Sequence, residues 1–231
     1  MLDFSQFEVL TFDCYGTLIN WEQGILTALR PVFEMHAISI NDQQILEAFA
    51  AAESQAEADS YLTYREILKS VMAALGKRYN FSPPESDMNS IAESIQHWPP
   101  FPDTVAALRK LQSRYKLGIL SNIDDDLFAG SARHLEIDFD WIITAQQLGS
   151  YKPSLSNFRA AIERIGLEKN QILHVAQSLF HDIAPAREVG LHTVWVNRRK
   201  GESGFGATPP SSAAPDLETA SLQELAERMG L

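Results

Sequence analysis

The sequence predicts an α/β protein built on a doubly wound parallel sheet, with a helical insertion after the first strand. Three observations lead to this fold class. Short apolar runs bounded by turn residues recur along the 231-residue chain. From about residue 100 onward these runs alternate with helical patterns, as expected for parallel strands joined by helices. Between about residues 20 and 97 the apolar spacing is helical, and no β alternation occurs.

Five apolar runs are the expected strands. Short runs without polar alternation suit strands that are buried on both faces of a parallel sheet. The runs cover residues 9–12, 117–120, 141–144, 172–176 and 193–196.

Helices are expected between these strands. Asp103 is a candidate N-cap for a helix over residues 103–115. The helical pattern over 156–166 stops at Gly166, and the pattern over 181–190 stops at Gly190. Pro185 marks the start of the regular part of the latter helix, because proline is tolerated in a first helical turn.

The insertion is expected to contain several helices and two breaks. Pro31 should kink or end the first helix, and residues 81–87 read as a loop. Three prolines within residues 97–103 predict a stiff re-entry into the sheet and a hinge. Residues 200–216 are rich in Gly, Pro and Ser, which favours a surface loop over a flap.

Composition narrows the function classes. A formal net charge of -11 argues against a nucleic-acid partner, whose phosphates need a basic surface. Cys14 is the single cysteine, so neither an intramolecular disulfide nor a cysteine-based metal site is expected. We find no signal-peptide pattern and no apolar stretch long enough for a membrane span, so a cytoplasmic protein without membrane contact is expected.

Polar residues follow the ends of the predicted strands, where ligands bind in open parallel sheets. Candidate catalytic residues are Asp13, Thr17, Ser121, Asn122, Lys152 and Asp182. Candidate substrate contacts are Cys14, Tyr15, Gln177 and Ser178, although Cys14 also reads as a small packed residue.

These residue types point to nucleophilic chemistry. A desolvated carboxylate at a strand-to-loop turn, such as Asp13, can attack carbon and leave an ester that water hydrolyses. Ser121 and Asn122 can hold oxygens of the substrate or intermediate. Lys152 can keep Asp13 ionised, and Asp182 can pair with Lys152 or accept a proton from the hydrolytic water.

For other polar and aromatic residues a structural role is favoured over a catalytic or binding role. A structural role is favoured for His174 and His181. The acidic run at residues 124–126 is better explained by a helix dipole than by a metal. Four aromatic residues could line a pocket between the insertion and the sheet, although each alone is more often a packing residue: Trp21, Tyr61, Tyr64 and Trp98.

Four stretches, "TFDCYGTL", "ILSN", "GSYKPS" and "HVAQSLFHDIAPA", resemble in their order the motifs of the haloacid dehalogenase superfamily. The resemblance implies a Rossmann-like core over 1–19 and 98–231 and a helical cap over 20–97. It also implies that Asp13 is the nucleophile, that Thr17 and Ser121 are its hydrogen-bonding partners, and that Lys152 balances charge. Asp182 would be the acidic residue of the last motif.

Tyr15 stands where the phosphatases of this superfamily carry a second aspartate, and tyrosine is a poor acid near neutral pH. The "D-x-Y-G-T" form resembles the type II 2-haloacid dehalogenases. That resemblance implies a small carboxylate substrate, an Asp13 ester, a halide leaving group and no cofactor. A homodimer is an expectation at the level of the family.

Two departures from the dehalogenase pattern leave the substrate open. Gln177, Ser178 and Leu179 replace the Ser-Ser-Asn usual in the dehalogenases, and neither Arg30 nor Arg65 fits the position of the arginine that grips the substrate. The stretches "HVAQSLFHDIAPA" and "RRKGESGFGAT" resemble the branch that contains L-azetidine-2-carboxylate hydrolase, which opens a ring by the same displacement. The same fold would also suit a magnesium-dependent phosphatase or a non-catalytic binding protein.

Overall fold

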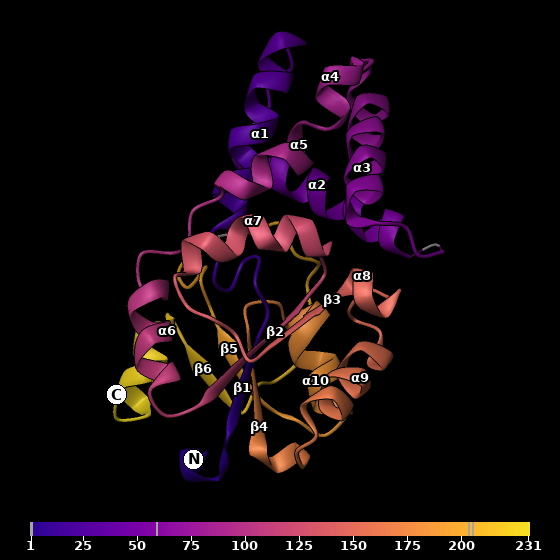
Figure 1. Ribbon diagram of the computed structural model, residues 1–231. Coiled ribbons are helices and arrows are strands. Elements are labelled where there is room, and N and C mark those ends of the chain that lie inside the picture. Colours follow the sequence, from indigo (N-terminus) through magenta and orange to yellow (C-terminus); the bar gives the residue numbers. More distant parts are fainter. Residues whose placement is uncertain (1, 59, 203, 205) are drawn as a thin grey trace.

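A single six-stranded parallel sheet forms the centre of the molecule (Figure 1). The computed structural model describes residues 2–58, 60–202, 204 and 206–231. The strand order is β3-β2-β1-β4-β5-β6, so the first strand lies inside the sheet and the chain winds outward from it in both directions. The strands are β1 (Val9–Phe12), β2 (Lys116–Ser121), β3 (Trp141–Thr144), β4 (Ile172–Ala176), β5 (His192–Val196) and β6 (Leu217–Thr219).

All five expected strands are confirmed, and the α/β fold class with them. Strands β1 and β4 are buried at every residue, as their unbroken apolar runs predict. The apolar pattern did not predict β6, which pairs with β5 through Val194 and Leu217. This strand is three residues long and carries the exposed Glu218, so it lacks the apolar run that identified the others.

Helices cover both faces of the sheet. One core cluster packs α6, α7 and α11 against one face, and a second packs α9 and α10 against the other. The helices beyond residue 100 are α6 (Thr104–Gln112), α7 (Asp125–Leu135), α8 (Ala145–Leu148), α9 (Leu155–Ile165), α10 (Ala184–Glu188) and α11 (Leu222–Arg228). A π-helical turn, η4 (Leu179–Ile183), precedes α10, and 3-10 turns lie at Phe4–Gln6 and Lys169–Gln171.

Asp103 does not cap α6 with its side chain, contrary to expectation. Its carboxylate instead accepts hydrogen bonds from Arg198 Nη1 at 2.7 Å and from the Leu222 amide of α11 at 2.8 Å. The sequence motif marks the helix start correctly, but tertiary partners take the carboxylate.

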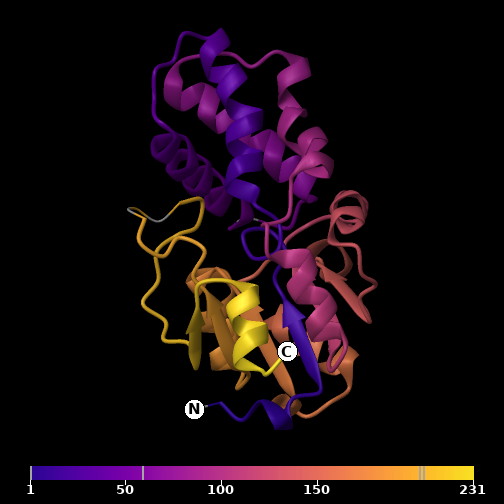
Figure 2. The ribbon, with the colours of Figure 1, turned by 90° about the vertical axis from the view of Figure 1, so that its left-hand side faces the viewer.

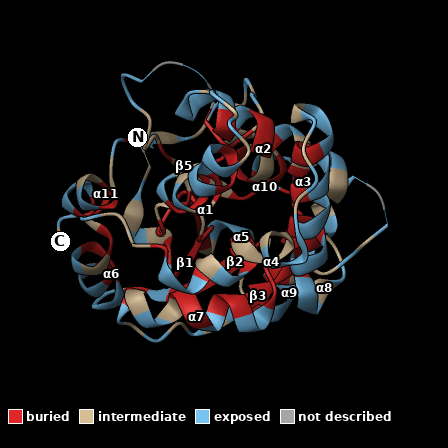
Figure 3. Cartoon of the chain, turned by 90° about the horizontal axis from the view of Figure 1, so that it is seen from above, coloured by how far each residue is buried: buried red, intermediate tan, exposed pale blue. Residues whose placement is uncertain are grey.

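A separate helical body lies above the sheet (Figures 1 and 2), and we propose that residues 20–97 are the cap and that 1–19 and 98–231 are the core. Viewed from above, α2, α3 and α7 each carry a buried stripe beside an exposed one (Figure 3). The helices of the proposed cap are α1 (Trp21–Met35), α2 (Asp42–Glu57), α3 (Tyr64–Tyr79), α4 (Glu85–Met88) and α5 (Ser90–Ser94), with a 3-10 turn at Ile95–His97.

Pro31 does not end the first helix, and the expected loop at 81–87 is confirmed only over residues 81–84. Helix α1 continues through Pro31 to Met35, because it buries Leu29 before the proline and Val32 and Phe33 after it, and this apolar contact outweighs the lost hydrogen bond. The expected loop at 81–87 is helical from Glu85, where the preceding prolines allow a helix to start.

The segment 200–216 is not simply a surface loop. Its residues Ser203 and Phe205 lie outside the described residues. Ala207 is fully buried, and its amide donates to Glu22 Oε1 of α1 at 3.0 Å. The segment therefore lies against the proposed cap. Across the described residues, we find no helix with the length and apolar character needed to span a bilayer.

Candidate active site

Asp13 lies directly after β1, at the carboxyl edge of the sheet. Its amide donates to the Val175 carbonyl of β4 at 3.2 Å, which continues the strand pairing to this residue. The chain then turns at Gly16, whose φ of +94° and close approach to Trp21 Nε1 exclude a side chain there without strain. The side chain of Asp13 is thereby aimed out of the strand end.

Lys152 joins Asp13 to Asp182. Its Nζ donates to Asp13 Oδ1 at 2.9 Å, to Asp182 Oδ1 at 2.6 Å and to the Leu120 carbonyl at 2.9 Å. The lysine side chain is 2% exposed, so these interactions lie out of water. A buried ammonium with three acceptors is fully satisfied and holds both carboxylates in one geometry.

His174 supports this arrangement from below. Its Nε2 donates to Asp182 Oδ1 at 3.0 Å, and its Nδ1 accepts from Thr11 Oγ1 at 2.9 Å. Both ring nitrogens are therefore used, which agrees with the structural role expected for His174.

Thr17 holds the other oxygen of the nucleophile. Its Oγ1 donates to Asp13 Oδ2 at 2.8 Å and accepts from the Gln177 amide at 2.9 Å. One hydroxyl thus ties the loop after β1 to the loop after β4.

Asp13, Asp182 and Lys152 shift one another's pKa values. Burial raises the pKa of Asp13 and outweighs the opposing attraction to Lys152. Burial also acts to raise the pKa of Asp182, but attraction to Lys152 and the hydrogen bond from His174 hold it below its ordinary value. For Lys152 the two carboxylates overcome burial and raise the pKa, so the lysine stays charged.

Tyr15 cannot serve as an acid at neutral pH. Its hydroxyl forms a 2.8 Å hydrogen bond with Ser131 Oγ of α7, and burial raises its pKa well above the ordinary value. The ring packs edge-on against Trp98. The side chain is therefore anchored and offers a wall to the site.

These residues line a small cavity of about 40 Å³ between the sheet edge and the helices α2 and α3. Most of the residues expected at the site meet there, namely Asp13, Tyr15, Ser121, Asn122, Lys152, Gln177, Ser178 and Asp182. Thr17 does not line the cavity, but its hydroxyl donates to Asp13. Cys14 is fully buried and is not among the residues that line the cavity, so the structure does not bring its side chain to the site.

Asn122 and Ser178 position the chain around the site. Asn122 donates to the Lys152 carbonyl at 3.0 Å and accepts from the Lys152 amide at 2.7 Å, a reciprocal pair that fixes the lysine backbone. Ser178 Oγ accepts from the His181 amide at 2.8 Å at the start of η4. Gln177 Oε1 accepts from Thr208 Oγ1 at 3.4 Å, which brings the segment 200–216 to the cavity wall.

Several cavity residues were not identified as site residues from the sequence. Glu53 and Glu57 reach the cavity from α2, His181 from η4 and Thr208 from the loop before β6. The two glutamates lie four positions apart, which places them on one face of a helix, and this spacing is the one signal that could have found them. Burial lowers the pKa of His181 to about 4, so its ring is neutral at pH 7.

Of the four aromatic candidates, Trp21 and Tyr64 line the cavity. Tyr61 instead stacks on Tyr151, with ring centroids 5.4 Å apart, and Trp98 packs against Tyr15.

The arginines of the proposed cap are not among the residues that line the cavity. Arg30 pairs with Asp42 at 2.5 Å, and Arg65 pairs with Asp126 at 2.5 Å. The guanidinium of Arg78 lies over the ring of Tyr79, 5.6 Å from its centroid.

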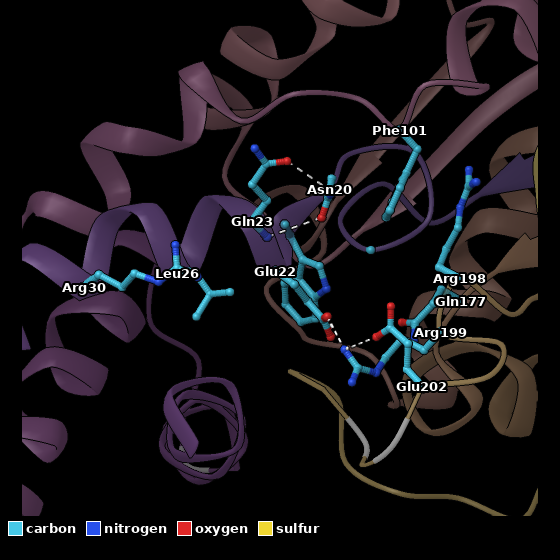
Figure 4. A pocket seen from close by; sticks show the side chains of 12 residues that line it. Asn20, Glu22, Gln23, Leu26, Arg30, Phe101, Gln177, Arg198, Arg199 and Glu202 are labelled. Atoms are coloured by element: carbon cyan, nitrogen blue, oxygen red, sulfur yellow. Dashed lines mark hydrogen bonds and ion pairs between the residues drawn. The ribbon is translucent and has the colours of Figure 1, made fainter. Parts of the chain in front are cut away.

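A second hollow of about 270 Å³ adjoins the cavity and shares Trp21 and Gln177 with it (Figure 4). In Figure 4 the guanidinium of Arg199 lies between Glu22 and Glu202, at 2.5 and 3.1 Å. Arg199 is thus already matched by carboxylates from the wall of this hollow.

The acidic run at residues 124–126 lies at the start of α7, and its first residue caps α3. Asp124 accepts from the amides of Tyr64 and Arg65 at 2.9 and 3.1 Å, so a core carboxylate caps the first turn of α3. Within the described residues, no group of three or more His, Cys, Asp or Glu side chains is arranged to hold a metal ion. The Lys152 ammonium already contacts Oδ1 of both Asp13 and Asp182.

Comparison with known proteins places the chain in one family. The family model for haloacid dehalogenase-like hydrolases matches residues 7–190. The (S)-2-haloacid dehalogenase H-109 of Pseudomonas putida is 23% identical over 206 residues, covering 87% of this chain and 91% of that protein.

Solved structures show the same fold. The L-2-haloacid dehalogenase of Xanthobacter autotrophicus with chloropropionic acid covalently bound has a TM-score of 0.79 at 19% identity, covering 97% of this chain and 98% of that one. A defluorinating L-2-haloacid dehalogenase has a TM-score of 0.82 at 20% identity, covering 97% and 96%. Fold, site geometry and family model agree, and the chain belongs to the haloacid dehalogenase-like hydrolases.

Proposed function

We propose that this hydrolase displaces the 2-substituent of a small carboxylate through an ester on Asp13. The observation that carries the proposal is the buried bridge from Lys152 to Asp13 and Asp182, at 2.9 and 2.6 Å, at the floor of a cavity. The bridge holds the nucleophile in place, and burial strips it of water, which makes a carboxylate more reactive toward carbon.

The proposed reaction has two steps. An oxygen of Asp13 attacks the substituted carbon, and the leaving group departs with the electron pair of its bond. Water then adds to the Asp13 ester carbonyl, the carbon product leaves as an alcohol, and Asp13 returns as a carboxylate. Lys152 and Thr17, which donate to the two Asp13 oxygens, would stabilise the charge that develops there. Asp182 is the proposed acceptor for the proton of the water.

A 2-haloacid is the substrate class we propose first. Halide leaves without a proton, which suits a site where Tyr15 is tied to Ser131. Relatives of this chain are named as (S)-2-haloacid dehalogenases, and one solved relative holds chloropropionic acid covalently. No cofactor is needed for such a displacement.

A specific observation favours a second candidate, the ring opening of L-azetidine-2-carboxylate. The proposed cap contributes the carboxyl groups of Glu53 and Glu57 to the cavity, where a haloacid site was expected to have an arginine. A substrate whose leaving group is a protonated amine would suit the carboxyl groups of Glu53 and Glu57 better than a substrate with a halide.

One turnover in heavy-oxygen water tests the shared mechanism. Peptide mass spectrometry should find heavy oxygen on Asp13 after hydrolysis of the ester, with 2-chloropropionate and azetidine-2-carboxylate as the two substrates. Unlabelled Asp13 after several turnovers of an accepted substrate would refute the ester. Magnesium-dependent hydrolysis of p-nitrophenyl phosphate at a rate above both would instead support a phosphatase.

A further inference from the structure

The cavity contains more acidic than basic groups. Four carboxyl groups line it, from Asp13, Glu53, Glu57 and Asp182, and the cation among its lining residues is Lys152. The ammonium of Lys152 is already bound by Asp13 and Asp182. The two glutamates therefore face the cavity without a matching cation among the residues that line it.

Glu53 and Glu57 are held in place by neighbours on both sides. The Tyr64 hydroxyl of α3 donates to Glu53 Oε1 at 2.5 Å, and the Glu53 residue is 4% exposed. The Asn122 amide of the core donates to Glu57 Oε1 at 3.5 Å. Because the two glutamates are one helical turn apart on α2, their carboxyl groups come to the same opening opposite Asp13.

Such a pair is costly to ionise in a small buried space. Burial raises the pKa of Glu53 to about 7, even with the hydrogen bond from Tyr64. Burial raises the pKa of Glu57 well above its ordinary value, and repulsion from Glu53 adds to this. The free site therefore binds protons here, and a bound cation could replace them.

We propose that Glu53 and Glu57 form a subsite for a protonated amine, so that the substrate is a small molecule with a cationic nitrogen beside the carbon that Asp13 attacks. This inference rests on the proposed attack by Asp13, and it takes the carbon–nitrogen candidate rather than the 2-haloacid as the substrate. The cavity is small, about 40 Å³, which favours a compact ligand over a large one. The breaking bond would be the carbon–nitrogen bond, the nitrogen keeping the electron pair and leaving as a neutral amine.

Calorimetric binding to Asp13→Asn tests the subsite without turnover. Azetidine-2-carboxylate and cyclobutanecarboxylate have the same ring size and the same carboxylate, but only the former carries the ammonium. We expect tighter binding of the former, with net proton release at pH 7 seen as a dependence of the heat on the ionisation enthalpy of the buffer. Equal affinities for the two ligands would overturn the subsite.

Substitutions on α2 give a second measurement. Adding Glu57→Gln or Glu53→Gln to Asp13→Asn should weaken azetidine-2-carboxylate binding about tenfold or more, as for the loss of a charge-assisted contact, and leave cyclobutanecarboxylate binding unchanged or stronger. Glu47→Gln, on the exposed side of the same helix, is the matched control and should change neither. Unchanged amine binding in both cavity variants would also overturn the subsite.

The two proposals fail in different ways. Heavy-oxygen labelling of Asp13 with 2-chloropropionate, combined with equal affinities for the two ring ligands, would leave the ester mechanism standing and remove the amine subsite. Selective amine binding without any labelling of Asp13 would leave the amine subsite standing and remove the ester mechanism.

Discussion

Removing Lys152 should destabilise the protein strongly, and more so at high pH. In Lys152→Met the three hydrogen bonds of Nζ, to Asp13, Asp182 and the Leu120 carbonyl, are lost from a site that is 2% exposed. Removing one partner of a buried ion pair costs about 3–5 kcal/mol, because the remaining charge stays buried. That is a large part of the roughly 5–15 kcal/mol by which a folded domain is stable.

The sign of the pH dependence follows from the carboxyl groups. In the native protein the pKa of Asp182 is below its ordinary value, so its stabilising effect is present above the unfolded-state pKa and lost as pH falls. Without Lys152, burial and mutual repulsion raise the pKa of both Asp13 and Asp182 above their unfolded values. The variant then binds protons on folding, so its stability deficit should shrink as pH falls from 8 to 5.

Urea denaturation of both proteins at pH 8 and pH 5 measures this effect. Lys69→Met, an exposed lysine on α3, is the control and should change the free energy of unfolding by less than about 0.5 kcal/mol. A deficit for Lys152→Met below about 1 kcal/mol at pH 8, or one that does not change with pH, would contradict a buried ionic bridge.

Two further substitutions test the hydrogen bonds around the site. Thr17→Val removes the donor to Asp13 and leaves the Gln177 amide without an acceptor, so the free energy of unfolding in urea should fall by about 2–4 kcal/mol. Thr17→Ser keeps the hydroxyl and should recover most of this loss. Equal free energies of unfolding for the two variants would show that the hydroxyl is dispensable. Asp124→Ala should cost about 1–2 kcal/mol and speed hydrogen exchange at the Tyr64 amide, whereas Asp124→Asn should lose less, and unchanged exchange in the alanine variant would refute the capping of α3.

The sequence alone predicted the core of the fold because its strands are buried on both faces. An unbroken apolar run such as 172–176, set between helical patterns, is best explained as a strand buried on both faces, and the structure has β4 there. Because parallel strands all end at one edge, the order of the runs was enough to bring Asp13, Lys152 and Asp182 together. The edge strand β6 was missed because Glu218 interrupts any apolar pattern.

Local signals failed where tertiary contacts outweighed them. Pro31 predicted a kink or an end of the first helix, but apolar residues on both sides of it are buried, and α1 does not end there. Asp103 marks a helix start, yet its carboxylate accepts hydrogen bonds from Arg198 and from the Leu222 amide, which are distant in sequence. Capping and helix-breaking preferences are worth only a few kcal/mol, so a buried contact can override them.

What the sequence by itself determined is the chemistry of the sheet edge, namely a carboxylate nucleophile, its lysine and a second carboxylate. Only the tertiary structure decided what faces them across the cavity. The helical spacing of α2 indicates that Glu53 and Glu57 share a face, but this spacing does not say against what that face will pack. Packing of α2 and α3 over the end of β1 brings these glutamates opposite Asp13, because burial of apolar surface, rather than any local preference, sets how the helices sit on the sheet.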